Sequence, residues 1–205
     1  FFAPVSFSLF RKDGSLFACI VNESGRRLEA DVTLECFGLD GTPLFSRHID
    51  GQELSGDEAR CVWTAGSDEL TATLPAGYGR EDCFIYGSMT ARTDDGGTTS
   101  MDDTLFLERW KRCPLQKAAI RLSVLPSGQL SLTSDRPAFY VALDLPGTRG
   151  QFSDNMFTLL PGREKLVSFS ASSYGWEGSA EAAEGGLTKT LEKNIRILSL
   201  KDTYS

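Results

Sequence analysis

A polar trio, Ser153-Asp154-Asn155, stands directly before the apolar-rich run 156–160. A carboxylate and an amide next to apolar sequence can act as a catalytic acid, bind a ligand, or close a tight turn. Such side chains readily bond nearby backbone amides, and both Gly150 and Asn155 tolerate unusual backbone angles. We therefore predict that Asp154 and Asn155 are structural turn residues. A ligand contact at Asp154 is the less favoured alternative.

Residues for hydrolytic catalysis are scarce. His48 is the single histidine, so any Ser-His-Asp or Cys-His arrangement has to use it, and no G-x-S-x-G motif is present. Glycoside hydrolysis needs two carboxylates about 5–10 Å apart in a cleft. The candidate acids occupy polar turns and nothing in the sequence pairs any two of them: Asp57, Glu58, Asp68, Glu69, Asp94, Asp95, Asp102, Asp103 and Glu177. We assign no catalytic residue.

The cysteines offer no metal site. They are widely spaced and form no C-x-x-C pair: Cys19, Cys36, Cys61, Cys83 and Cys113. The sequence also contains no H-E-x-x-H or EF-hand spacing, so we expect neither a metal nor a cofactor. Cys19 and Cys36 lie in apolar strand patterns and are predicted to be reduced core thiols, which favours a cytoplasmic protein. Asn22-Glu23-Ser24 matches a glycosylation sequon, a pattern short enough to arise by chance.

Aromatic residues suggest a carbohydrate contact. Tyr174 and Trp176 follow a predicted strand at 165–170, in a loop from which they could stack on a sugar face. Packing against the same or a neighbouring domain is the favoured alternative, because large aromatics dominate cores and interfaces. Trp63 and Trp110 lie in strand-like sequence and are expected in the core.

Composition excludes several partners. The net charge is −7, and the densest basic stretch is only residues 109–112, which argues against binding to nucleic acid. No apolar run approaches the roughly 20 residues of a membrane helix. The chain begins Phe1-Phe2-Ala3-Pro4, with no initiator methionine and no signal-peptide features, so we expect it to be part of a longer polypeptide.

Period-two alternation dominates the chain. In residues 30–36, Val32, Leu34 and Cys36 share one face and polar residues share the other, as in a half-buried strand. Similar patterns predict strands at 5–10, 16–22, 60–64, 83–92, 104–109, 119–125, 128–134, 138–144, 156–160, 165–170 and 194–200. The helix-friendly patch 178–186 is expected to be a loop.

Short strands without helical crossovers predict an all-β protein made of two tandem antiparallel immunoglobulin-like β-sandwiches. We place the domains at 1–113 and 114–205, since Cys113-Pro114 separates the two sets of strands.

Several stretches together resemble glycoside hydrolase family 2 enzymes of the β-mannosidase type. The first half resembles their penultimate sandwich at Phe2-Ala3-Pro4-Val5-Ser6, Val21-Asn22 and Phe37-Gly38-Leu39-Asp40-Gly41. The second half resembles their C-terminal immunoglobulin-like domain at Ser134-Asp135-Arg136-Pro137-Ala138, residues 150–155, Leu159-Leu160-Pro161-Gly162 and residues 199–204.

The resemblance implies a retaining enzyme that removes β-linked mannose, or in related branches glucosamine, from non-reducing ends, with two catalytic glutamates on a (β/α)₈ barrel. This chain lacks the alternating strand–helix pattern of such a barrel, so no catalytic residue is transferred to it. The expected function is a non-catalytic accessory region, with the other domains of its own polypeptide as partners. The alternative is an autonomous module that binds oligosaccharide through Tyr174 and Trp176.

Overall fold

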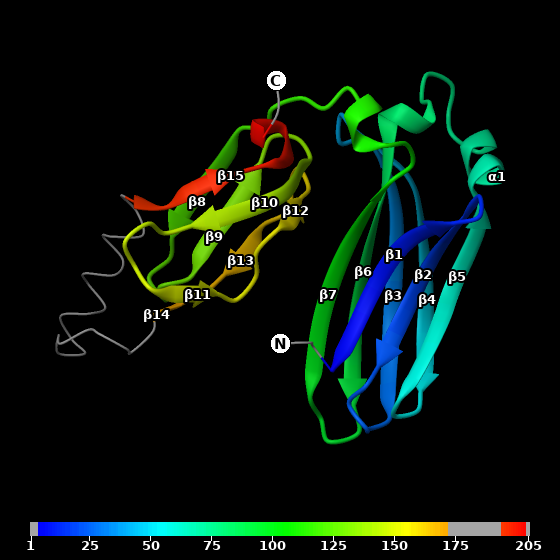
Figure 1. Ribbon diagram of the computed structural model, residues 1–205, viewed down its shortest axis with the longest axis horizontal. Coiled ribbons are helices and arrows are strands. Elements are labelled where there is room, and N and C mark those ends of the chain that lie inside the picture. Colours follow the sequence, from blue (N-terminus) through cyan, green and yellow to red (C-terminus); the bar gives the residue numbers. More distant parts are fainter. Residues whose placement is uncertain (1–3, 172–193, 204–205) are drawn as a thin grey trace. The chain divides into compact units, whose positions relative to one another are not determined.

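A computed structural model describes residues 4–171 and 194–203. The predicted all-β class is confirmed, since nearly every element is an antiparallel strand (Figure 1). The chain divides into two compact units, residues 1–114 (unit 1) and 115–205 (unit 2), one residue from the expected boundary.

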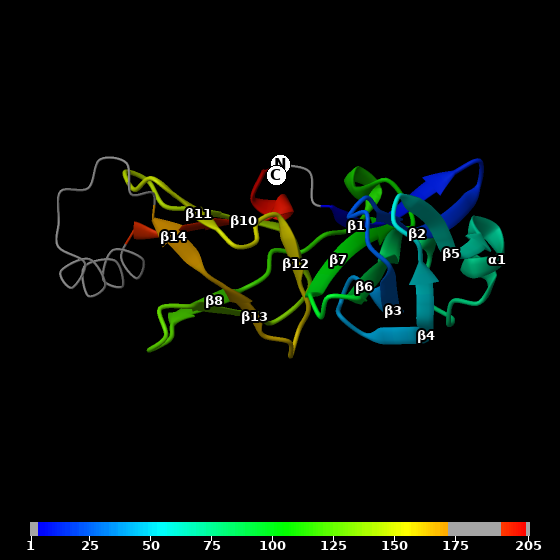
Figure 2. The same cartoon turned by 90° about the horizontal axis from the view of Figure 1, so that it is seen from below.

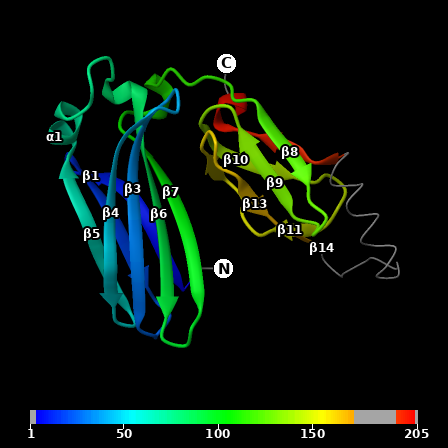
Figure 3. The same ribbon diagram turned by 180° about the vertical axis from the view of Figure 1, so that it is seen from behind.

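Unit 1 is a sandwich of two antiparallel sheets (Figure 3). The first has the order β1 (Val5–Lys12), β2 (Ser15–Asn22) and β5 (Glu58–Gly66). The second has the order β4 (Pro43–Leu54), β3 (Leu28–Gly38), β6 (Cys83–Thr93) and β7 (Thr98–Phe106). The alternation predicted for β3 is observed, because Val32, Leu34 and Cys36 are all buried between the sheets.

Three short helices complete unit 1: α1 (Ser67–Ala72), η1 (Arg80–Asp82) and η2 (Trp110–Arg112). Trp63 is buried on β5 as expected. The expectation for Trp110 is wrong: β7 ends at Phe106, and Trp110 begins η2 as a half-buried residue.

The prediction of a reduced thiol at Cys19 is also wrong. Cys19 on β2 forms a disulfide with Cys61 on β5, its partner across the strands. This bridge joins two neighbouring strands of one sheet, and Cys36 remains a buried free thiol. The expected cytoplasmic location therefore loses Cys19 as support.

Asp103 ties the edges of the two sheets together. Its Oδ2 accepts a hydrogen bond from the backbone N–H of Leu9 on β1 at 2.7 Å, and Arg11 of β1 donates to the carbonyls of Phe106 and Leu107. Burial raises the pKa of the Asp103 carboxyl, and the negative charge of neighbouring Asp102 raises it a little further. The hydrogen bonds from the backbone N–H groups of Leu9 and Thr104 lower this pKa, but burial outweighs them. The folded state therefore binds this proton more tightly than the unfolded chain does.

We expect the Asp103 carboxyl to reduce stability as pH rises above its ordinary pKa of 3.8. The folded state holds this proton more tightly than the unfolded chain, so stability falls as pH rises through the folded pKa. Asp103→Asn removes the titration and keeps an acceptor, so its stability relative to wild type should increase with pH in that window. Urea titrations over a pH series measure the difference. A difference that does not vary with pH contradicts the burial argument.

Unit 2 is a smaller sandwich whose layers are seen edge-on in Figure 2. One sheet has the order β12 (Phe157–Leu159), β10 (Ala138–Asp144) and β15 (Arg196–Leu198). The other has the order β13 (Lys165–Val167), β9 (Leu130–Ser134) and β8 (Ile120–Val124). The predicted strand 165–170 divides instead, because its second half leaves β13 and forms β14 (Phe169–Ala171), which pairs with β11 (Gly150–Phe152).

The end of the described chain is held to the start of unit 2. In η3 (Leu200–Thr203), the carboxylate of Asp202 accepts from the Lys117 ammonium at 2.7 Å and from the backbone N–H and hydroxyl of Ser199. These contacts, led by Lys117, lower the pKa of Asp202 to about 2. The carboxylate is therefore stabilised in its charged form.

We expect Asp202→Asn to destabilise unit 2 by about 1 kcal/mol at neutral pH, because the Lys117 ammonium is 75% exposed and solvent screens the ion pair. The contribution of a carboxyl with a lowered pKa is present above its ordinary value of 3.8 and is lost as pH falls through about 2. The two proteins should therefore converge in stability at acid pH. Unfolding followed by hydrogen exchange of unit 2 peptides measures this, and an equal difference at both ends of the pH range contradicts it.

Candidate functional site

Asn155 holds the segment before β12 to the end of β10. Its Oδ1 accepts from the backbone N–H of Leu143 at 2.8 Å, and its Nδ2 donates to the Leu143 carbonyl at 3.0 Å. The side chain thus takes the place of a strand beside the end of β10. The next residue, Met156, donates its N–H to Val141 at 2.9 Å and begins the approach to β12.

Asp154 bonds locally and also reaches a neighbouring strand. Its Oδ1 accepts from the Asn155 backbone N–H at 2.8 Å, and its Oδ2 lies 2.6 Å from the Lys165 ammonium on β13. The Asp154 side chain is 41% exposed, so the ion pair is screened by solvent. Both oxygens therefore have a partner within unit 2.

The backbone reasons given for Gly150 and Asn155 are wrong. The left-handed angle falls on Met156, with φ of 65°, and on neither of those two residues. Gly150 is required by close packing instead, because a Cβ there would lie 2.3 Å from the Phe169 ring and 2.6 Å from the Ser170 carbonyl oxygen.

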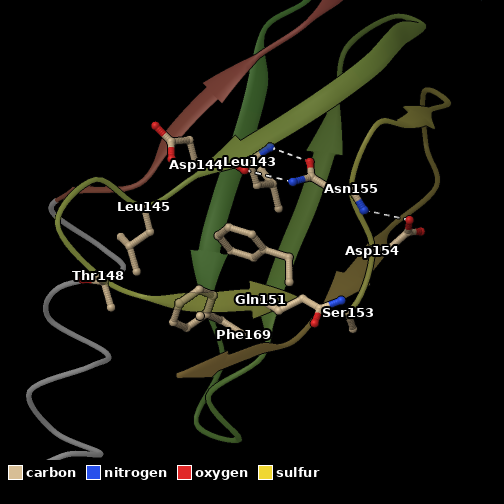
Figure 4. Close-up of a pocket in the computed structure, with 11 residues that line it drawn as sticks. Leu143, Asp144, Leu145, Thr148, Gln151, Ser153, Asp154, Asn155 and Phe169 are labelled. Atoms are coloured by element: carbon tan, nitrogen blue, oxygen red, sulfur yellow. Dashed lines mark hydrogen bonds between the residues drawn. The ribbon is translucent and has the colours of Figure 1, made fainter. Parts of the chain in front are cut away.

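A pocket of about 490 Å³ opens beside the trio (Figure 4). Its wall follows the chain from the end of β10 through the β10–β11 connection and β11 to the trio, and Phe169 on β14 completes it. The lining residues are Leu143, Asp144, Leu145, Thr148, Gly150, Gln151, Phe152, Ser153, Asp154, Asn155 and Phe169. The volume lies within the range of about 300–1,000 Å³ typical of small-molecule sites.

The sequence predictions did not identify Thr148, Gln151, Phe152 and Phe169 as lining residues. One signal was available: Pro146-Gly147 predicts a turn that presents Thr148. The contribution of Phe169 depends on its register opposite Phe152, and residues 17 apart give no periodic signal for that pairing.

None of the other candidates among the described residues lines this pocket. Tyr174 and Trp176 lie outside the described residues. His48 lies exposed on β4, an edge strand, where its Nδ1 lies 3.0 Å from the Thr33 hydroxyl. Asn22 of the sequon is fully buried, and its Nδ2 donates to the carbonyls of Arg26 and Ser55, so this amide is closed to modification in the folded chain.

The described residues offer neither a metal-binding cluster nor a membrane-spanning helix. Within residues 4–171 and 194–203, no group of three or more His, Cys, Asp or Glu side chains is arranged to hold a metal ion. In the same part of the chain, no helix has the length and apolar character needed to cross a membrane.

Comparison with known proteins agrees with this fold. Residues 115–203 match the Ig_mannosidase family, an Ig-fold domain. Among solved structures, the chain is similar to the β-D-mannosidase of Dictyoglomus thermophilum, with 13% identity and a TM-score of 0.64 over 96% of this chain and 22% of that chain. It is also similar to the exo-chitosanase CsxA of Amycolatopsis orientalis, with 14% identity and a TM-score of 0.51 over 96% of this chain and 25% of that chain.

The chain therefore spans about a quarter of the length of these two proteins. At these identities the likeness to solved structures concerns the fold alone. None of the curated protein sequences matches the chain. The resemblance noted in the sequence is confirmed to this extent: residues 115–203 match the Ig_mannosidase family, and the chain shares the fold of part of a β-mannosidase and of part of an exo-chitosanase.

Proposed function

We propose that this chain is a non-catalytic accessory region of a family 2 glycoside hydrolase of the β-mannosidase type, and that its sandwiches brace other domains of the same polypeptide. The match of residues 115–203 to the Ig_mannosidase family is the observation that carries the proposal. The chemistry of the pocket is compatible with it, since one of its two carboxylates, Asp154, forms an ion pair with Lys165.

A largely uncharged sheet face in unit 1 supports the bracing role. Three successive cross-strand rows on the outer side of the β1–β2–β5 sheet contain no charged residue: Ser6–Val21–Ala59, Ser8–Cys19–Cys61 and Phe10–Phe17–Thr64. The next row, Lys12–Ser15–Gly66, places one lysine at the end of this face. Phe10 is 37% exposed and stacks on Phe17 with ring centroids 5.2 Å apart. Protein–protein contacts are enriched in aromatic residues and depleted of charged ones at their centre, which agrees with these three rows.

The outer face of the other sheet has the opposite character. Its rows contain Glu29 opposite Arg92, then Asp31, then Asp102 opposite Ser88. Asp31 and Arg92 also form an ion pair at 3.5 Å. The charged side chains of this face favour contact with water. We therefore assign the contacts with other domains to the outer face of the β1–β2–β5 sheet.

A hydrolysis assay tests the proposal. The chain should release no p-nitrophenol from p-nitrophenyl β-mannoside or p-nitrophenyl β-glucosaminide above the buffer rate, with an active β-mannosidase as the positive control. Turnover comparable to that of the control would reject the accessory role, because the catalytic groups would then have to lie within this chain.

A further inference from the structure

We infer that the pocket beside Asn155 is a binding site for a neutral oligosaccharide end, one or two hexose rings in size. The inference goes beyond the proposed accessory role, which places the function of the chain in contacts between domains. It uses none of the residues on the outer face of the β1–β2–β5 sheet.

Apolar groups form one part of the pocket. Phe152 and Phe169 lie directly opposite each other on β11 and β14, with ring centroids 4.9 Å apart and planes tilted by 57°. Both rings are half-buried and line the opening, together with Leu145. Gly150, opposite Ala171 in the same pair of strands, has no side chain to cover the Phe169 ring. Aromatic and aliphatic surface of this kind packs against the C–H faces of a pyranose ring.

Polar groups that can still form a hydrogen bond make up the other part of the pocket. Among the described residues, the Thr148 hydroxyl and the Gln151 side-chain amide have no hydrogen-bond partner and line the pocket. The Ser153 Oγ accepts from the Ser168 N–H at 2.9 Å, which leaves its own proton to donate. Hydroxyl and amide groups next to apolar surface match a molecule that alternates hydroxyls with C–H faces.

Charge argues for a neutral ligand. The lining residues include no lysine, arginine or histidine, so an anion gains no ion pair there. Of the two lining carboxylates, Asp154 is engaged by Lys165. Figure 4 shows the Asp144 carboxylate pointing away from Thr148 and Gln151. Neither sign of charge on a ligand is favoured inside the pocket.

Hydrogen bonds hold both walls of the pocket in place before any ligand binds. Leu145-Pro146-Gly147-Thr148 is a turn closed by the Thr148 N–H to the Leu145 carbonyl at 3.2 Å, with Gly147 at φ of 78° as such a turn requires. On the far side, Ser153 and Ser168 exchange two hydrogen bonds at 2.8 and 2.9 Å. A site held on both sides loses little entropy when it binds a ligand.

Titration of the isotope-labelled chain with β-1,4-mannobiose, followed by amide NMR, tests the inference. We expect saturable shifts at Thr148, Gln151 and Ser153, with a Kd of about 1 mM. Gln151→Ala and Thr148→Val should each weaken binding by about fivefold, which corresponds to one lost hydrogen bond. Gln52→Ala on β4 of unit 1 is the matched control and should leave the affinity unchanged. The same spectra report whether each variant remains folded.

Three outcomes overturn the inference. The first is the absence of saturable shifts at the pocket amides in the folded wild type. The second is equal affinity in wild type, Gln151→Ala and Thr148→Val. The third is stronger binding of mannuronic acid or glucosamine than of mannobiose, since the pocket would then select charge. None of them bears on the hydrolysis assay, so failure here is distinct from failure of the accessory role.

Discussion

Replacing both Cys19 and Cys61 by serine is expected to lower the free energy of unfolding of unit 1 by about 2–4 kcal/mol. The disulfide joins residues 42 apart in sequence and so restricts the unfolded chain. Cys61 is exposed, so a thiol reductant can reach the bridge in the folded protein. Urea titration of the oxidised wild type and the double variant, with hydrogen exchange of unit 1 peptides as the readout, measures the loss.

Two controls accompany this prediction. A reductant should lower the stability of wild type toward that of the double variant and leave the variant unchanged. Thiol labelling of the unreduced wild type in denaturant should detect the three cysteines that are free in the structure: Cys36, Cys83 and Cys113. Labelling of all five cysteines, with no effect of reductant, would show that the pair is reduced and would restore the original expectation for Cys19.

The disulfide could not be predicted from alternation, because a bulge changes the pairing of β2 with β5. Ala18 lies opposite Trp63, but Cys19 lies opposite Cys61, so Val62 is the extra residue on β5. Without this bulge, regular pairing would place Cys19 opposite Val62. Sequence periodicity gives the faces of each strand correctly up to such a point, but it does not locate the point.

The same distinction applies to other features: those set within one strand were predicted, and those set by pairing between distant segments were not. Burial on β3 was predicted because it depends only on period two within one strand. The break at Ser168, between β13 and β14, was not, because those strands pair with β9 and β11 respectively. The pocket depends on that break, since β14 brings Phe169 opposite Phe152. Its position was therefore not predictable from the sequence around the trio.

Asn155 illustrates how a correct residue was given an incomplete reason. The sequence predicted a structural role through backbone angles, yet the side chain bonds Leu143, 12 residues earlier in the chain, through both its oxygen and its nitrogen. This contact closes the loop that surrounds the pocket. Asn155 therefore determines the shape of the pocket wall as well as the stability of unit 2.

Asn155→Ala is expected to destabilise unit 2 by about 1–3 kcal/mol, because it leaves the N–H and carbonyl of the buried Leu143 without these partners. Asp154→Ala is the matched control. It removes a solvent-screened ion pair and one local bond, so its melting temperature should fall by less, with a cost of about 1 kcal/mol or below.

Amide hydrogen exchange separates the two variants at single residues. Asn155→Ala should speed exchange at Leu143 and at Met156, whose N–H bonds Val141 in the same junction, whereas Asp154→Ala should leave Leu143 protected. Asn155→Asp keeps the acceptor for the Leu143 N–H and loses the donor to its carbonyl, so it should fall between the wild type and Asn155→Ala in stability. Equal losses in Asp154→Ala and Asn155→Ala would mean that the local turn, and not the bridge to β10, holds this part of unit 2 together.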